Sequence, residues 1–352
     1  MLLTEANEFN TDGAPVYCMP YGGGHINMTY LVLDDTARLY IMQKINRTVF
    51  RDPQALMENI VICCDHLAKK GCGSREALRF IPGKTGKAWY VDENGEYWRM
   101  YAYISDCITF QAPGDSKDAQ EIMLQAGKAI GQFLTMLADL NADQLSETIP
   151  NFHNTPARYR ALDVAISEDV VGVVPEVTRE IDFALARRDF SHTLVDLQKT
   201  GVLPTRVIHN DTKINNVLFD RETRKSICVI DFDTVMPGLV AYDFGDAVRF
   251  GANTAAEDER DLSKVSFSLE LYHSYAKGFL SACGDSLSSE EKTHLPTGAV
   301  MMTLECGVRF LTDYLCGNKY FKVHYPTHNL DRCRVQFKLV QEMENNRHAM
   351  LL

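Results

Sequence analysis

The sequence lacks several features that would assign a protein to a class at once. No stretch of its 352 residues reaches the ~18 consecutive apolar residues of a membrane-spanning helix, and no run of basic residues occurs. The formal net charge of -11 argues against nucleic acid or an anionic membrane surface as a main partner, because both require clustered lysine and arginine. No internal repeat or low-complexity tract is present. The N-terminal segment lacks a basic start and a long apolar stretch, so we expect a cytoplasmic protein.

The cysteines form no pattern that would indicate disulfides or a metal centre. There are ten, scattered along the chain without a CxxC pair, which is typical of reduced thiols that pack as small apolar side chains. A zinc site can be considered at four neighbouring residues, Cys63, Cys64, His66 and Cys72. Cys63 and His66 would share one helix face, but no second matched pair of ligands follows, so we do not expect zinc there.

The composition predicts a protein with a substantial core. With 45% apolar residues over 352 positions, two lobes are expected rather than one compact domain. We expect a smaller N-terminal lobe at 1–104, ending in a hinge strand, and a larger C-terminal lobe at 105–352.

The most informative motif lies between His209 and Asn216. These residues have the HxDxKxxN spacing of a kinase catalytic loop, and Asp231 follows fifteen positions after Asn216. A His-Asn-Asp sequence alone would favour a turn, since Asn and Asp hydrogen-bond their own backbone. Apolar strands expected at 206–209 and 217–219, and another at 226–232 that carries the later aspartate, favour the catalytic loop.

Each residue of the motif suits one task in phosphoryl transfer. The transition state is loose, so an enzyme mainly positions the partners and screens the charge on the peripheral oxygens. We expect Asp211 to be the general base and Lys213 to face the transferred phosphoryl group. Asn216 and Asp231 offer hard oxygen donors, which suit Mg²⁺. Asp233 is a further candidate for a metal or sugar contact.

The N-terminal part has the element order of a nucleotide-binding lobe. An apolar strand at 28–33 is preceded by three glycines whose backbone N–H groups could close on phosphates, Gly22, Gly23 and Gly24. Three glycines alone more often form a plain hairpin turn, but the downstream loop favours the nucleotide. A returning strand at 39–45 follows, and then a helix from about Pro53 to Lys70.

The strand after that helix is expected to be the hinge. It covers 98–104 and includes Tyr101 and Tyr103, and its backbone would hydrogen-bond the adenine of ATP.

One position departs from the protein-kinase pattern, in which the third strand carries a phosphate-binding lysine paired with a helix glutamate. Here period-two alternation aims Gln43 and Lys44 to opposite faces, so either residue could take the role, and Gln43 is the preferred candidate. Glu58 would be the helix partner if Lys44 held the phosphates, although it could also be a plain exposed residue.

The C-terminal two-thirds predict mainly helices. Apolar residues recur at helical spacing in 118–140, and further helices are expected at 155–200 with breaks, 263–282, 297–315 and 330–346. The sequence at 242–246 is similar to the DFG motif of kinases. We interpret it as a helix start with a structural Asp243, because Asp231 has the better position for a metal.

With these residues in place, the chain resembles the aminoglycoside phosphotransferase and choline kinase branch of the protein-kinase-like fold, and within that branch the N-acetylhexosamine 1-kinases. The resemblance implies an α+β fold of two lobes, a small antiparallel β-sheet lobe and a larger, mainly helical one. The segments that carry it, several of them not general kinase motifs, are 21–27, 151–156, 209–216, 230–238, 243–251, 261–265 and 305–311.

The resemblance implies an activity and a set of site residues. Such enzymes use ATP and Mg²⁺ to phosphorylate the anomeric hydroxyl of N-acetylglucosamine or N-acetylgalactosamine. Sugar contacts are implied for His25, Asp211, Thr234, Arg309 and Tyr320, and the family usually has glutamine in the place of Lys44. From the residues themselves, Arg309 could instead pair with Asp313, His25 could cap the hairpin and Tyr320 could belong to the core.

Three hypotheses follow. The first is a cytoplasmic sugar 1-kinase with a small-molecule sugar and ATP as its partners. The second keeps the fold and changes the acceptor to an aminoglycoside, choline or another sugar. The third is a binding module without catalysis, which the presence of Asp211, Asn216 and Asp231 argues against. The sequence does not rank the two amino sugars or fix the oligomeric state.

Overall fold

The computed structural model describes residues 2–22, 26–114 and 118–352 of the chain. These residues divide into two compact units. The first comprises Met1–Ile108, Asp139–Pro150 and Leu218–Met236, and the second comprises Thr109–Ala138, Asn151–Val217 and Pro237–Leu352.

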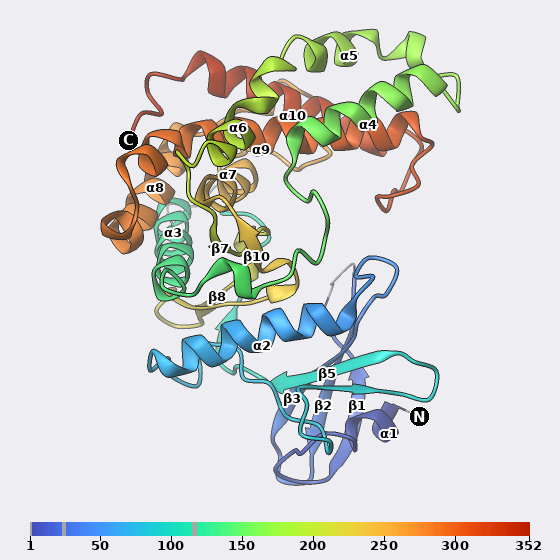
Figure 1. Ribbon diagram of the computed structural model, residues 1–352, viewed down its shortest axis with the longest axis vertical. Helices are drawn as coiled ribbons and strands as arrows, with labels where there is room; N and C mark the ends of the chain where they lie inside the picture. The colour runs from blue at the N-terminus through green and yellow to red at the C-terminus, as the bar shows by residue number, and fades with distance from the viewer. Residues whose placement is uncertain (1, 23–25, 115–117) are drawn as a thin grey trace. The chain divides into compact units, whose positions relative to one another are not determined.

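The first unit is built on a five-stranded antiparallel sheet with the strand order β1-β2-β3-β5-β4. Figure 1 shows it together with the short helix α1 (Leu2–Ala6). On β2, residues at every second position are buried, as a sheet with one face on a core requires. Tyr30, Val32, Met42 and Met100 form that core. The strands are β1 (Pro15–Pro20), β2 (Met28–Asp34), β3 (Leu39–Lys44), β4 (Trp89–Val91) and β5 (Tyr97–Ala102).

Helix α2 (Pro53–Lys69) follows β3, as the sequence indicated. The side chain of Asp52 accepts the N–H of Ala55 at 3.0 Å, and Pro53 occupies the first turn, where its missing N–H costs nothing. Gly71, with a φ of +84°, turns the chain away after the helix.

Three short strands complete the first unit: β6 (Cys107–Ile108), β8 (Val217–Asp220) and β9 (Ser226–Val229), in the order β6-β8-β9. The strand expected at 226–232 therefore ends three residues early. The reason is that Asp231 has a left-handed backbone, with φ 66° and ψ 63°, and Phe232–Thr234 form a 3-10 turn.

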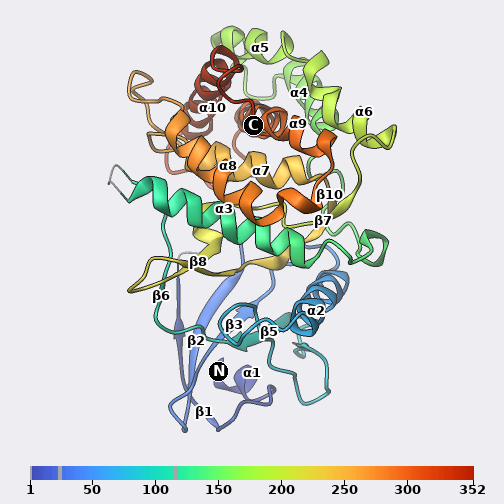
Figure 2. The same cartoon turned by 90° about the vertical axis from the view of Figure 1, so that its left-hand side faces the viewer.

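The second unit is mainly helical (Figure 2). A two-stranded sheet pairs β7 (Arg206–Ile208) with β10 (Met236–Gly238). Buried apolar residues from α4, α5, α9 and α10 form one continuous core. The helices are α3 (Ala119–Met136), α4 (Thr155–Glu168), α5 (Thr178–Leu185), α6 (Thr193–Lys199), α7 (Val240–Gly251), α8 (Leu269–Cys283), α9 (Ser289–Leu315) and α10 (His328–Asn345).

Two of the expected helices begin elsewhere than the apolar spacing indicated. Helix α8 starts at Leu269 rather than 263, because Ser268 caps it by accepting the N–H of Leu271. Helix α9 starts at Ser289 rather than 297, since Ser288 and Glu291 form a capping box. Polar caps thus override the apolar pattern at both starts.

The antiparallel sheet of the first unit and the helices of the second confirm the expected fold class. Within the residues described, no helix combines the length and apolar character needed to cross a membrane.

Candidate active site

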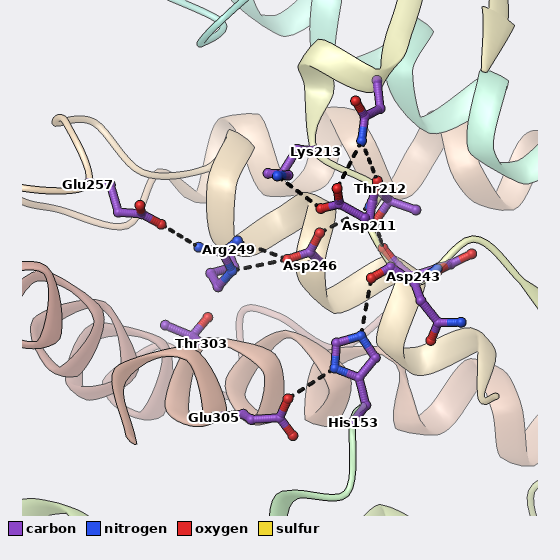
Figure 3. A network of polar contacts seen from close by, with 12 residues as sticks. His153, Asp211, Thr212, Lys213, Asp243, Asp246, Arg249, Glu257, Thr303 and Glu305 are labelled. Atoms are coloured by element: carbon purple, nitrogen blue, oxygen red, sulfur yellow. Dashed lines mark hydrogen bonds and ion pairs between the residues drawn. The ribbon is translucent and has the colours of Figure 1, made fainter. Parts of the chain in front are cut away.

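The catalytic-loop motif folds as one compact piece of the second unit. It follows β7, passes through Asn210 in a left-handed conformation and ends in a 3-10 turn, Ile214–Asn216. The carboxylate of Asp211 lies 3.1 Å from Nζ of Lys213 (Figure 3). The side-chain amide of Asn216 donates to Asp211 Oδ2 at 3.2 Å. The structure therefore brings together the three motif residues that the sequence placed in one loop.

Charge and hydrogen bonding give these three residues different states. The neighbouring Asp211 carboxylate holds the pKa of Lys213 well above its usual range, so the lysine stays cationic. Asn216 also donates through Nδ2 to the carbonyl of Asp211, at 2.9 Å. This leaves the amide oxygen of Asn216 as a hard donor of the kind that Mg²⁺ prefers.

Two carboxylates of helix α7 hold the catalytic loop by accepting hydrogen bonds from its backbone. Asp243 accepts the N–H groups of His209 and Asn210 at 2.8 and 2.6 Å, and Asp246 accepts the N–H of Thr212 at 3.0 Å. Because the helix starts at Val240, Asp243 lies in its first turn rather than at its cap. Asp243 is thus structural, as expected, and it holds the backbone of the catalytic loop.

Charged side chains surround both Asp243 and Asp246 and shift their pKa values. Burial raises the pKa of Asp243 to about 6, although the two N–H groups and the nearby His209 and His153 act in the opposite direction. Asp246 has a lowered pKa: burial would raise it, but the positive charges of Arg249 and Lys213 prevail. Arg249 bonds Asp246 at 2.9 Å.

A second support reaches the loop from α9. Buried Glu305 lies 3.0 Å from Nδ1 of His153, and Nε2 of the same histidine lies 3.2 Å from the carbonyl oxygen of Asn210 (Figure 3). Glu305 also accepts the hydroxyl of Thr155 at 2.7 Å. The histidine therefore links a buried carboxylate to the residue directly before Asp211.

Arg309, expected to contact a sugar, lies about one helical turn after Glu305 on α9. Its guanidinium faces the rings of Phe152, Tyr320 and Phe321 at 5.7, 5.9 and 5.5 Å. The alternative ion pair with Asp313 is wrong within the described residues, because that carboxylate instead accepts the N–H groups of 319–321 and the amide of Asn329.

Tyr320 is brought close to Arg309 and is 66% exposed, so its assignment to the core is wrong. The fixed backbone at 319–321 explains the exposure: Asp313 holds this segment while the tyrosine ring projects from it. Arg158 adds a second positive charge nearby, and its pKa is lowered by burial and by Arg309.

In the first unit, Gln43 and Lys44 point to different partners, as alternation predicted. Gln43 donates to Thr29 at 3.0 Å and accepts two hydrogen bonds from Arg99. Lys44 pairs with Glu96 at 3.2 Å and lies over the ring of Trp98. The proposed partner Glu58 is instead exposed and bonded to Gln54, so the pair of Lys44 with Glu58 is wrong.

The metal loop and the hinge also belong to the first unit. Asp231 is exposed, whereas Asp233 and Thr234 are buried. Tyr101 is half-buried, and burial holds the pKa of its hydroxyl well above the usual range. The hydroxyl of Tyr103 lies 3.4 Å from that of Tyr21.

The glycine loop is only partly described. Gly22 has a φ of +74°, which suits a residue without a Cβ. Gly23, Gly24 and His25 lie outside the described residues, so their expected contacts stay predictions.

The donors suit Mg²⁺ better than zinc. Within 2–22, 26–114 and 118–352, no three His, Cys, Asp or Glu side chains gather as a metal centre would require. His66, considered as a zinc ligand, pairs with Asp139 at 2.9 Å. Asp231 of the first unit offers an exposed carboxylate, and Asn216 of the second unit offers an amide oxygen. Both are hard donors of the kind that Mg²⁺ prefers.

Several residues of these networks were not anticipated. Arg99, His153 and Glu305 had no assigned role in the sequence. A signal existed for Arg99, since a charged residue between Trp98 and Met100 on an apolar strand requires a buried partner. No local signal links His153 with Glu305, which are 152 positions apart.

The model of the phosphotransferase enzyme family matches residues 18–276, which is well over half of the chain.

Three solved structures share the fold across most of the chain. A microcompartment-associated aminopropanol kinase is 14% identical, with a TM-score of 0.61 and coverage of 100% of this chain and 98% of its own. An amicoumacin kinase in complex with AMP-PNP, Ca²⁺ and its ligand is 13% identical, with a TM-score of 0.65 and coverage of 98% and 93%. An ethanolamine kinase of Plasmodium vivax is 16% identical, with a TM-score of 0.57 and coverage of 91% and 82%. At these identities the likeness concerns the fold alone.

Proposed function

The chain belongs to the phosphotransferase enzyme family, and from this premise we propose that it is an ATP-dependent sugar 1-kinase. Its acceptor would be the anomeric hydroxyl of N-acetylglucosamine or N-acetylgalactosamine, and its product the sugar 1-phosphate. The acceptor assignment rests on the resemblance of segments 151–156, 261–265 and 305–311 to the N-acetylhexosamine 1-kinases.

The assignment of Asp211 as the general base rests on the contacts of its carboxylate. Its two carboxylate oxygens face Lys213 and Asn216 at 3.1 and 3.2 Å. The loop that holds it is fixed by Asp243, Asp246 and His153. A carboxylate in a rigid loop, beside a permanently cationic lysine, can take the proton of an acceptor hydroxyl while the lysine faces the phosphoryl oxygens.

The nucleotide and cation would use the remaining expected residues. We assign Asn216 and Asp231 to Mg²⁺, which when bound would screen the charge of the phosphates. Gln43, with Gly22 of the glycine loop, would border the nucleotide phosphates. Tyr101 and Tyr103 would border its adenine. Lys44 is a weaker candidate, since its charge is paired with Glu96.

The charge around Arg309 favours a neutral acceptor over a cationic one. Arg309 and Arg158 are close enough for the first to lower the pKa of the second, and the nearby Glu305 is already bonded to His153 and Thr155. A positively charged acceptor next to these guanidiniums would be repelled. Sugar hydroxyls and an N-acetyl carbonyl would instead accept hydrogen bonds from Arg309 and could stack on exposed Tyr320.

The test is a coupled assay of ADP release with Mg²⁺ over a panel of sugars and amines, with the phosphate position determined on the product. We expect turnover with one or both N-acetylhexosamines, with phosphate on C1. Asp211→Asn should lose about two to four powers of ten in kcat, because the amide cannot accept the proton. Asp189→Asn, which changes an exposed aspartate in the 3-10 turn before α6, is the control and should keep wild-type turnover.

The panel also decides between the alternatives. The solved structures of aminopropanol, amicoumacin and ethanolamine kinases make amines the natural comparison set. Turnover with an amine but with neither amino sugar would replace the sugar assignment and keep the kinase. Nucleotide binding without turnover on any acceptor would favour a binding module, and full activity of Asp211→Asn would remove the base assignment.

A further inference from the structure

The first unit contains a buried arginine, Arg99, to which the proposed reaction assigns no role. Arg99 on β5 is 3% exposed and stands opposite Gln43 of β3 in the sheet register. Residues opposite each other on an antiparallel pair share a face, which explains the bonds from Nε and Nη2 of Arg99 to Gln43 Oε1 at 2.9 and 2.7 Å. The third nitrogen, Nη1, lies 2.5 Å from Oδ1 of Asp233.

Asp233 is held from its other side as well. Asn27 donates to Asp233 Oδ2 at 2.5 Å, and the aspartate is 5% exposed. Asp233 is thus neutralised and fixed, so it is a poor candidate for the metal or sugar contact considered from the sequence.

The fixed Asp233 lies two residues after Asp231, whose backbone is strained. Asp231 has φ 66° and ψ 63°, a left-handed conformation that is unfavourable for a residue with a Cβ, and its side chain is exposed. Such a conformation persists only where neighbouring contacts hold the chain. The 3-10 turn at 232–234 and the bonds of Asp233 supply such contacts.

We propose that Arg99 is a positioning residue for the metal loop. By pairing with Asp233 it anchors 231–233 to β5 and cancels one of the two carboxylates of the loop, so that Asp231 alone is presented to a divalent cation. The inference rests on the proposed function only in assigning Asp231 to the cation.

The experiment measures Mn²⁺ binding to the full chain in the presence of ADP, by electron paramagnetic resonance, with no acceptor and no turnover. Arg99→Gln should weaken Mn²⁺ binding about 10-fold or more, in the range typical of residues that orient a metal ligand. Arg99→Lys keeps a charge for Asp233 and should weaken it less. Asp231→Asn marks the effect of losing the ligand itself.

A double variant separates anchoring through Asp233 from a direct role of Arg99. Arg99→Gln combined with Asp233→Asn removes both charges and allows two amides to bond each other, so Mn²⁺ binding should recover to within about threefold of wild type. A double variant no better than Arg99→Gln would overturn the proposal. The double variant also tests the proposal if Arg99→Gln alone fails to fold, because the double variant leaves no unpaired charge buried.

The matched control is Glu58→Gln, an exposed charge change on α2 of the same unit, which should not alter Mn²⁺ binding. Wild-type affinity in folded Arg99→Gln, or a wild-type chain that binds no Mn²⁺ with ADP, would overturn the proposal. Mn²⁺ binding that responds to Arg99 in a chain that phosphorylates no acceptor would instead support Arg99 while the proposed function fails.

Discussion

Single carboxylates that accept several backbone N–H groups fix much of this structure. Asp34 holds the β2–β3 turn, Asp243 holds the catalytic loop and Asp313 holds the segment that carries Tyr320. Each is buried, and each compensates the cost of its burial with hydrogen bonds to donors that would otherwise lack a partner.

The contribution of such a carboxylate to the stability of the fold can be measured at Asp34. Burial alone would raise its pKa, but the N–H groups of Arg38 and Gly13, the Thr36 side chain and the Tyr40 hydroxyl together lower it to about 2. A lowered pKa in the folded state contributes stability above the unfolded value of 3.8, and this contribution is lost as the pH falls from about 4 to about 2.

We therefore expect Asp34→Asn to lower the free energy of unfolding at pH 7 by about 1–3 kcal/mol, since an amide presents N–H groups to N–H donors. Urea unfolding at several pH values measures this. The difference from wild type should shrink as the pH falls from about 4 to about 2. Asp35→Asn, which changes an exposed neighbour, is the control. A difference that stayed constant over this pH range would contradict the interpretation.

At the scale of elements, close packing depends on glycines that no local pattern reveals. Helices α3 and α8 approach so closely that a Cβ on Gly278 would lie 2.0 Å from the carbonyl oxygen of Leu124, and one on Gly127 would lie 2.2 Å from that of Tyr275. Both helices were predicted from apolar spacing, but their contact was not, because a glycine within a helix reads in sequence as a weakness.

Gly278→Ala should destabilise the second unit by about 1–3 kcal/mol or more, because the clash is with backbone and cannot be relieved by a rotamer change. Chemical denaturation followed by circular dichroism measures the loss. Gly284→Ala is the matched control at the end of the same helix, where a Cβ would find its nearest atom at 3.8 Å and φ is −55°. Equal stability of the two variants would show that α3 and α8 are not packed as described.

Comparing the predicted with the observed helix bounds shows which parts of the fold follow from the sequence. Helix α2 was predicted almost to the residue, because Asp52, Pro53 and Gly71 are local signals that act on the backbone beside them. The predicted starts of α8 and α9 were wrong. Ser268 caps α8 inside the stretch that the apolar spacing had assigned to the helix, and Ser288 caps α9 before a first turn that is polar. Local sequence signals therefore predict that a helix is present. Its predicted first residue is wrong where the capping residue does not coincide with the start of the apolar pattern.

For the whole molecule, the candidate site was predictable only as far as it is continuous in sequence. Asp211, Lys213 and Asn216 lie within six residues and were assigned together, and the structure brings them together. Asp243 and Asp246 lie 33 or 34 positions from the loop residues that they hold, and His153 lies 57 positions from Asn210. His153 and its partner Glu305 are 152 positions apart, and the ion pair of Arg99 with Asp233 joins residues 134 positions apart. Such pairs are fixed by tertiary packing, which no window of sequence contains.

Ligand linkage tests the proposed function on the entire chain. A ligand that binds only the folded state stabilises it by about 2.7 kcal/mol at a concentration 100 times its Kd. ADP with Mg²⁺ should therefore raise the melting temperature by several degrees, and EDTA should remove most of the rise, because Asn216 and Asp231 need the cation to hold the phosphates. Differential scanning calorimetry with and without EDTA measures both effects.

Asp231→Asn is the informative variant in this measurement. It should melt close to wild type without ligand, since the Asp231 side chain is exposed, yet gain little from Mg²⁺ and ADP. Because Asp231 is assigned to the cation and not to adenine, a small gain from ADP alone should persist in the variant and in EDTA. Stabilisation by ADP that was equally large with EDTA, or in the variant, would mean that the nucleotide binds without the cation, and the assignment of Asp231 would have to be abandoned.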